Sequence, residues 1–354
     1  MRFIPQYEPI IEKDYADCVH DQIMSGWLGP GQAVSAFENK ICEITGTKYA
    51  IATTSGTTAL YVSILATTKK DEHIYFPDYT FIAGANAARI CDRRVELIDI
   101  KENTLCMDPE ILSDNLKHRR GCPGGVIFVN HNGYVDSDRY DIKEICIGYG
   151  ITMIEDSSQS LGIWDCSGLH AGRLGDVGIF SFSVPKLVTT GQGGCIITDN
   201  ENIAIECRRL IDQGGEWRKT KVHECVGGNF KFNDILASYG LAQLERIDDL
   251  LQRREQIFDW YREHISIVDF GYESTWMVLY RTKKAKEIID KLKENNIQAT
   301  QFYNPIHKNP PYIVEDPIFP CATKVSKEIV YLPSSLNLTK EEINLICDII
   351  KSIE

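Results

Sequence analysis

The chain has 354 residues, of which 43% are hydrophobic and 25% charged, and its formal net charge is −12. This length predicts one large domain and a smaller one, while the acidic balance argues against nucleic acids and anionic membranes as partners. No apolar run approaches the ~18–20 residues of a membrane span, and the first fifteen residues carry acids and a proline where a signal peptide is apolar.

Seven short apolar runs predict the strands of the first two-thirds of the chain. They are YAIATT (49–54), HIYF (73–76), VELIDI (95–100), GVIFVN (125–130), ITMIED (151–156), VGIFSF (177–182) and CIITD (195–199). Several are apolar throughout, which is typical of a parallel sheet whose two faces are both covered. Helix-like segments alternate with these runs, so the order predicts an α/β fold.

The last third of the chain is dominated by helix-like sequence. We predict helices over about 234–264, 284–295 and 339–352. The last of them begins with Thr339 and Glu342, which have the spacing of a capping box. Because the pattern changes here, we predict a large domain over residues 1–245 and a small C-terminal domain over residues 246–354.

Twelve cysteines are scattered singly along the chain, without a C-x-x-C pair. A disulfide framework is not expected in so long a chain, so we interpret them as reduced thiols of a cytoplasmic protein. The eight histidines form no H-E-x-x-H motif and no His/Cys cluster, so we predict no metal site.

A Ser-Gly-Thr-Thr motif directly follows the first predicted strand and opens a helix-like run. Free N–H groups at a helix start, a glycine and hydroxyl side chains together suit an anion, so Gly56 and Thr57 are candidate phosphate contacts. Serine and threonine are also common as simple N-caps, and the motif alone does not decide between the two roles.

Two further strand ends carry side chains that suit a flat ring. Asp156 ends the run 151–156, where its carboxylate would keep a cationic ring nitrogen protonated, with Gln159 close by. The sequence Asp-Ser-Ser is equally good helix-capping sequence. Phe81 follows the run 73–76 and would stack on a ring, although core packing is the more frequent role of phenylalanine.

The most informative stretch is FSVPKLVTTGQGG, residues 182–194, which places Lys186 between two apolar strands. Most lysines are solvated surface charges, and a glycine-rich turn is usually only a turn. A lysine held among buried strands is costly unless its amine is neutral or covalently engaged. Lys186 is therefore a candidate imine-forming lysine, and Ser181 offers a hydroxyl beside it.

In combination these features describe the needs of one cofactor, pyridoxal 5′-phosphate (PLP). They supply a phosphate site, a stacking aromatic ring, a carboxylate for the pyridine nitrogen and an imine-forming lysine. The joint arrangement is much more specific than any of its parts.

Over nearly its whole length the chain resembles the DegT/DnrJ/EryC1/StrS sugar aminotransferases. The resemblance rests on SGWLGPGQAVSAFENKICEITGTKYAIATTSGTTAL, FPDYTFIAGANA, IEDSSQSLG, LGDVGIFSFSVPKLVTTGQGG, GGNFKFNDILASYGLAQLERID, FYNPIHKNPPY and YLPSS. It implies the aspartate-aminotransferase fold (PLP transferase type I), with a mostly parallel seven-stranded sheet in the large domain and a smaller C-terminal α+β domain.

The resemblance also implies a role for each candidate residue. Lys186 matches the Schiff-base lysine, Asp156 the partner of the pyridine nitrogen and Phe81 the stacking ring. The remaining cofactor contacts that it implies are Gln159, Gly56, Thr57 and Ser181. Asn229 matches an asparagine that reaches the cofactor phosphate of the neighbouring subunit, which implies a homodimer with shared sites.

Three departures from the family pattern put the substrate in question. The usual Tyr-Gly after the strand histidine reads Asn132-Gly133-Tyr134, the usual Glu of the glycine turn is Gln192, and Ser-Ser follows Asp156 where Ala-Ala is commoner. A dehydratase branch of the family has histidine at the position of Lys186, so the lysine argues against that branch.

The resemblance implies transfer of an amino group from L-glutamate to a nucleotide-linked keto-sugar in deoxyamino-sugar or surface-glycan biosynthesis. GDP-4-keto-6-deoxymannose or a similar 4-keto-6-deoxyhexose is the expected acceptor. Alternatives are a UDP- or dTDP-linked 4-keto or 3-keto sugar, a small keto-phosphate, and a PLP-binding regulator without turnover. Tyr303 and His307 are candidates to line the sugar pocket, although a loop histidine can equally be idle.

Overall fold

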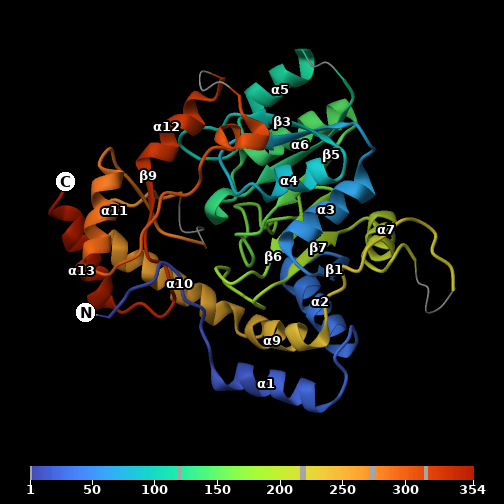
Figure 1. The fold of residues 1–354 in the computed structure, drawn as a ribbon, viewed down its shortest axis with the longest axis horizontal. Coiled ribbons are helices and arrows are strands. Elements are labelled where there is room, and N and C mark those ends of the chain that lie inside the picture. Colours follow the sequence, from blue (N-terminus) through green and yellow to red (C-terminus); the bar gives the residue numbers. More distant parts are fainter. Residues whose placement is uncertain (1, 119–120, 216–220, 271–275, 315–317) are drawn as a thin grey trace.

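A computed structural model describes residues 2–118, 121–215, 221–270, 276–314 and 318–354 (Figure 1). The strands are β1 Tyr49–Thr53, β2 His73–Pro77, β3 Arg94–Ile98, β4 Pro123–Val129, β5 Thr152–Asp156, β6 Val177–Ser181, β7 Gly194–Thr198, β8 Leu279–Arg281 and β9 Ile329–Tyr331. The first seven confirm the seven predicted runs, with ends that move by one or two residues.

The helices in the described residues surround these strands. They are α1 Lys13–Met24, α2 Gln32–Thr45, α3 Gly56–Thr67, α4 Ala83–Ile90, α5 Pro109–His118, α6 Asp138–Tyr149, α7 Glu201–Ile211, α9 Asp234–Leu244, α10 Ile247–Arg262, α11 Ala285–Glu294, α12 Pro320–Glu328 and α13 Lys340–Lys351, with short 3-10 turns at His131–Gly133, Ile306–Lys308 and Pro310–Tyr312. None of these helices combines the length and the hydropathy needed to cross a membrane.

The large sheet has seven strands in the order β1-β7-β6-β5-β4-β2-β3, and β7 alone among them runs antiparallel to both of its neighbours. The strands β3, β2, β4, β5 and β6 are mutually parallel. Their carboxyl ends therefore meet at one edge, where ligands of open α/β sheets bind.

Helices cover both faces of this sheet, which explains why several of its strands are apolar throughout. On one face, Ile74 and Phe76 of β2 pack with residues of α3, α4 and α7. On the other face, Tyr75 packs with residues of α5 and α6, and the β6 and β7 side chains pack against α2 and α9. The observed fold is the α/β fold that the sequence predicts.

The C-terminal part has its own hydrophobic core and a two-stranded antiparallel sheet of β8 and β9. Isoleucines on one face of α13 enter this core, and Thr339 and Glu342 form the predicted capping box. Ile4, near the N-terminus, also belongs to this core. It forms an isolated β-bridge with Ile297. The domain boundary near residue 245 stays a prediction.

The prediction of one helix over 234–264 is wrong in one respect, because this range contains two helices, α9 and α10. They are separated at Glu245 and Arg246, and Arg246 leaves the helical region with φ −117° and ψ 24°. No proline or glycine marks this break. The helix predicted over 284–295 is confirmed as α11.

Candidate active site

A cavity of about 660 Å³ lies at the carboxyl ends of β2, β4, β5 and β6. Seven of the eight candidate residues line it, namely Gly56, Thr57, Phe81, Asp156, Gln159, Ser181 and Lys186. The N-terminal segment adds Gln6 and Tyr7, and the C-terminal part adds Trp276, Met277, Gln298, Phe302 and Tyr303. The cavity is therefore built from three distant regions of the sequence.

Lys186 lies on the loop between β6 and β7, and its backbone is fixed from both sides. Its N–H donates to the carbonyl of Ser183 at 3.0 Å, and its own carbonyl accepts a hydrogen bond from the Tyr7 hydroxyl. The Nζ atom lies 4.7 Å from the centre of the Trp276 ring, and no described residue forms a hydrogen bond or ion pair with it. Burial lowers the pKa of Lys186 to about 8, against a smaller opposing effect of Asp156. A larger fraction of this amine than of an ordinary lysine is thus neutral and nucleophilic at physiological pH.

Asp156 is the last residue of β5 and faces the same cavity. Burial raises the pKa of its carboxyl group, while hydrogen bonds from Ser158 and the charge of Lys186 oppose this rise. The Ser158 N–H donates to Oδ1 at 3.0 Å. Asp156 therefore caps a turn, and not the helix considered for it, and its carboxyl group also lines the cavity. A cationic ring nitrogen would compensate its burial.

The first turn of α3 packs closely against the ends of β6 and β7. Ser55 is the N-cap, and its hydroxyl accepts the Thr58 N–H at 3.0 Å. A Cβ atom on Gly56 would lie 2.8 Å from Cβ of Ser181, and one on Gly194 would lie 2.3 Å from the carbonyl oxygen of Ser55. Only glycine fits at either position. The N–H groups of Gly56 and Thr57 form no hydrogen bond with a described residue, and both residues line the cavity, so the helix start is open to an anion there.

Phe81 is 60% exposed although it is apolar, and it lines the cavity. Its ring centre lies 6.2 Å from that of Tyr303. The core-packing role considered for this phenylalanine is thus not what the structure shows. An exposed flat ring beside a lysine and a carboxylate suits a stacking partner.

Gln159 connects the cavity to two neighbouring segments. Its Oε1 accepts the Asn132 N–H at 2.6 Å, and its Nε2 lies 3.1 Å from the Tyr303 hydroxyl, to which it donates. Burial keeps the Tyr303 hydroxyl protonated by raising its pKa. The orientation of the Gln159 amide is thereby fixed at both ends.

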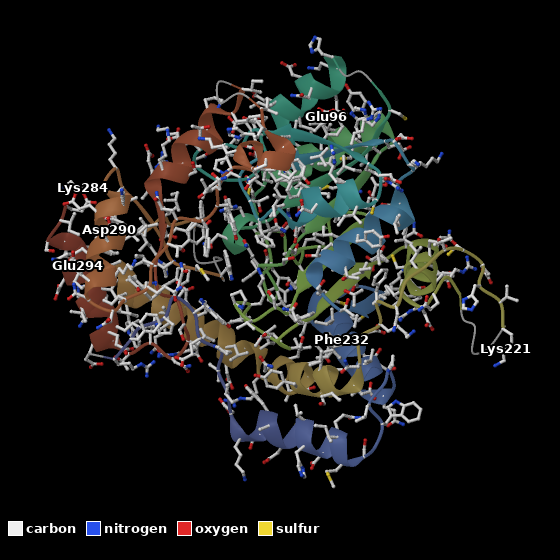
Figure 2. The ribbon with its side chains drawn as sticks, in the orientation of Figure 1. Glu96, Lys221, Phe232, Lys284, Asp290 and Glu294 are labelled. Carbon is white, nitrogen blue, oxygen red and sulfur yellow. The ribbon has the colours of Figure 1, made fainter. Side chains whose placement is uncertain are left out.

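Asn229 does not line the cavity of its own chain. It is exposed and forms a bridge with Asp212, in the segment that follows α7. Figure 1 shows this segment extending away from the sheet, and Lys221 lies near its outer end in Figure 2. The position of Asn229 leaves it accessible to another molecule.

The expectation that His307 lines the sugar pocket is wrong. His307 is buried and lies 2.5 Å from Asp78 through Nδ1, with its ring stacked on Phe319. It holds the loop after residue 302 against the end of β2. Tyr303, the other candidate, does line the cavity.

Sequence reasoning did not single out Tyr7, although it anchors the Lys186 backbone. The residue lies 179 positions away from Lys186, in a segment without regular structure. The run Gln-Tyr-Glu-Pro around it carries no motif. No local signal could have found it.

The residues of the cavity fit PLP. The Lys186 amine is without a described partner, the glycine positions leave room that a Cβ would fill, and an exposed ring and a carboxylate face the same space. These are the groups that the cofactor requires.

Comparison with known proteins gives a consistent result. The family model DegT/DnrJ/EryC1/StrS aminotransferase matches residues 9–351. The chain is 28% identical to the GDP-perosamine synthase of Escherichia coli O157:H7, covering 98% of both chains, and 27% identical to that of Vibrio cholerae, covering 99% of this chain and 98% of the other. The PLP form of Spr1654 from Streptococcus pneumoniae superposes with a TM-score of 0.90 at 22% identity, covering 100% of this chain and 98% of the other.

Proposed function

The chain belongs to the DegT/DnrJ/EryC1/StrS aminotransferase family and is a PLP-dependent aminotransferase, and we propose that it transfers an amino group from L-glutamate to a nucleotide-linked keto-sugar. We propose GDP-4-keto-6-deoxymannose or a similar 4-keto-6-deoxyhexose as the acceptor. The matches to two GDP-perosamine synthases over almost their full length support this choice. The observation that carries the proposal is that Lys186, whose pKa is lowered to about 8, and Asp156 line the same cavity.

Bound PLP would supply an electron sink for the pair released at the α-carbon of the amino donor. Asp156 would hold the proton on the ring nitrogen, and burial would strengthen that ion pair. Lys186, with its pKa lowered to about 8, would carry the proton between the donor α-carbon and the C4′ carbon of the cofactor.

The remaining cavity residues would bind and orient the cofactor. The start of α3, with Gly56 and Thr57, and the Ser181 hydroxyl would hold the phosphate, and Phe81 would stack on the ring. Gln159, fixed by Asn132 and Tyr303, would contact the ring edge.

The sugar would lie against the side of the cavity formed by Trp276, Met277, Phe302 and Tyr303. An apolar and aromatic wall suits a sugar that carries a methyl group in place of a hydroxyl, because no hydrogen-bonding group is then buried without a partner. This composition favours a 6-deoxy sugar over a fully hydroxylated one.

We also propose that the active form is a cytoplasmic homodimer with shared sites. Lys186 is the only lysine or arginine among the described lining residues, so the anionic groups of donor and nucleotide would require further donors. Asn229 is exposed, and so are large apolar side chains near it in sequence, such as Val226, and at or just after the end of α1, namely Met24, Trp27 and Leu28. A second copy of the chain would cover them.

Twelve unpaired cysteines in the described residues support the proposed cytoplasmic location, because the cytoplasm is a reducing compartment.

The test of the substrate is an assay of the PLP-loaded protein with L-glutamate and a panel of GDP-, UDP- and dTDP-linked keto-sugars. We expect an amino-sugar product and 2-oxoglutarate, with the highest kcat/KM for a GDP-linked 4-keto-6-deoxy sugar. A higher value for a UDP- or dTDP-linked sugar, or for a small keto-phosphate, would replace the proposed acceptor. Glutamate leaving the visible absorption band of the bound cofactor unchanged would contradict the proposed donor.

The test of the shared site is complementation between two inactive variants. Subunits carrying Lys186→Ala are mixed with subunits carrying Asn229→Ala under conditions that allow exchange. Partial recovery of activity is expected, because one site of a mixed dimer is then intact. Two independently complete sites would give no recovery above the sum of the separate variants.

A further inference from the structure

Asn132 makes an unusual contact between the sheet and the C-terminal part. It follows β4, is buried, and has a left-handed backbone with φ 55° and ψ 19°. Its side-chain Nδ2 donates to the Met277 carbonyl at 2.7 Å, and its Oδ1 accepts the Met277 N–H at 3.2 Å. The amide thus pairs with both polar groups of one backbone residue, as a neighbouring strand would.

The paired backbone belongs to the wall that lies beside Lys186. Trp276 precedes Met277, and its Nε1 donates to the Pro185 carbonyl at 2.8 Å, while its ring faces the Lys186 amine. Buried Arg254 donates to the Trp276 carbonyl from behind. Asn132 therefore supplies both bonds by which the sheet holds the backbone of Met277.

The backbone of Asn132 performs a second task. Its N–H donates to Gln159, the residue that we propose for the ring edge of the cofactor. One residue thus contacts Gln159 through its backbone and the Trp276–Met277 wall through its side chain. The two contacts can be separated, because glycine adopts the left-handed conformation, keeps the N–H and lacks the amide.

We infer that Asn132 is a positioning residue that sets the place of the Trp276–Met277 wall relative to Lys186 and thereby the fit of the keto-sugar. The inference rests on the proposed function in assigning that wall to the sugar. A carboxylate at this position lacks the donor for the Met277 carbonyl, and an apolar side chain would leave both Met277 groups unpaired.

The test compares Asn132→Gly with Asn296→Gly. Asn296 has a similar left-handed backbone, with φ 60°, but it is exposed and lies outside the cavity lining. For Asn132→Gly we expect the KM of the keto-sugar to rise about tenfold, because two buried hydrogen bonds are lost. The rate of the reaction with glutamate alone should fall less than the KM of the keto-sugar rises, because the Asn132 N–H that fixes Gln159 is kept. Asn132→Asp, which loses only the donor, should show the same split and provides a second variant if the glycine variant does not fold.

A second measurement does not depend on any sugar. Bound PLP quenches a nearby tryptophan, and the contribution of Trp276 is obtained by difference from Trp276→Phe. Displacement of the wall should change the quenching of Trp276 in Asn132→Gly and leave it unchanged in Asn296→Gly. Unchanged quenching in both would overturn the inference, as would an equal loss in both half-reactions. If Asn132→Gly changes the quenching of Trp276 but the wild type aminates no keto-sugar, the positioning role of Asn132 is supported and the proposed function is contradicted.

Discussion

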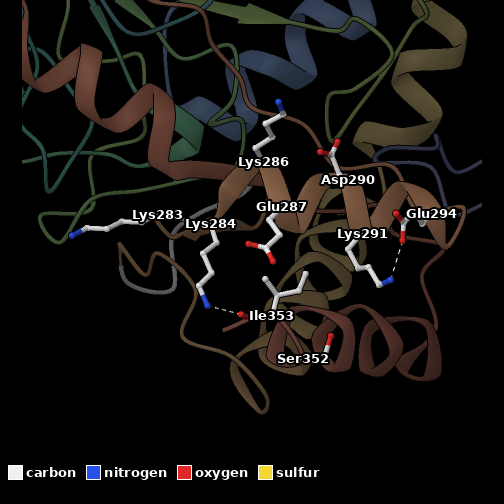
Figure 3. A pocket seen from close by; sticks show the side chains of 9 residues that line it. All are labelled: Lys283, Lys284, Lys286, Glu287, Asp290, Lys291, Glu294, Ser352 and Ile353. Atoms are coloured by element: carbon white, nitrogen blue, oxygen red, sulfur yellow. Dashed lines mark hydrogen bonds and ion pairs between the residues drawn. The ribbon is translucent and has the colours of Figure 1, made fainter.

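Two cavities of about 660 Å³ each show that size and lysine content do not define a site. The first is the candidate active site, which contains Lys186. The second is an open groove between α11 and the end of α13, lined by Lys283, Lys284, Lys286, Glu287, Asp290, Lys291, Glu294, Ser352 and Ile353 (Figure 3). Four lysines line the groove, and one lines the cavity.

The groove lysines are exposed and are partnered or solvated. Lys291 lies 2.9 Å from Glu294, and Lys284 donates to the Ile353 carbonyl at 2.5 Å. In Figure 3 the side chains of Lys283 and Lys286 point away from those of Glu287, Lys291 and Ile353. Lys186 differs because burial lowers its pKa to about 8 and no described residue is bonded to its amine. Desolvation, and not proximity to other lysines, lowers the pKa of Lys186.

The largest difference in turnover between a cavity variant and a groove variant should appear when the Lys186 amine is removed. Lys186→Ala is expected to lower turnover by about 10²–10⁴-fold, because the proton carrier is lost. Lys286→Ala in the groove should leave kcat and KM unchanged. Steady-state rates with glutamate and keto-sugar provide the measurement, and similar rates for the two variants would contradict the assigned role.

The carboxylates of the two regions allow a second contrast. Asp156→Asn is expected to lower kcat by about 10²-fold, since removing one member of a buried ion pair costs about 3 kcal/mol or more. Asp290→Asn, at the exposed groove, serves as the control. If both variants retained full activity, Asp156 would not be the partner of the ring nitrogen.

Replacing Lys186 should lower activity but raise the stability of the cofactor-free protein. A pKa lowered from 10.5 to about 8 means that the unfolded chain binds more protons between these values, so the wild type gains stability as pH rises through this window. Lys186→Met should therefore be more stable than the wild type below pH 8, by at most about 3 kcal/mol. This advantage should disappear as the pH approaches 10.5.

Denaturant unfolding at pH 7 and pH 10 measures this difference. Lys284→Met, in the groove, should show no comparable gain at pH 7. A destabilised Lys186→Met at neutral pH would mean that the amine is not desolvated in the folded protein.

The smallest expected effect concerns the exposed aromatic ring. Phe81→Ala should weaken PLP binding about tenfold, which is the scale of a lost stacking contact with its buried area. Ile147 is equally exposed at 60% but lies on α6 outside the cavity, so Ile147→Ala should bind PLP as the wild type does. Titration of the cofactor-free proteins with PLP gives both constants.

The sequence predicted the strands well because the strands of a sheet covered on both faces are rich in apolar residues, and all seven runs are short and rich in them. The strand order could not be predicted, since nothing local in β7 indicates that it runs antiparallel between β1 and β6. The break between α9 and α10 was missed for a related reason, because Arg246 is an ordinary helix former.

The site was predictable where chemistry lies within strand ends and their loops. Gly56, Asp156 and Lys186 each follow or precede a strand, and the sheet brings them together. Tyr7 and Asn132 act through backbone groups of distant segments, which no pattern in a single sequence reveals. His307 was misjudged because burial by Asp78 and Phe319 depends on the tertiary fold.

The most direct test of the account is to load the protein with PLP, reduce it with borohydride and map the modified peptide by mass spectrometry. Reduction fixes a lysine–cofactor linkage permanently, whatever the sugar substrate is. We predict one modified residue, Lys186, at close to one PLP per chain. Modification at Lys284, Lys286 or another exposed lysine in place of Lys186 would contradict the central claim.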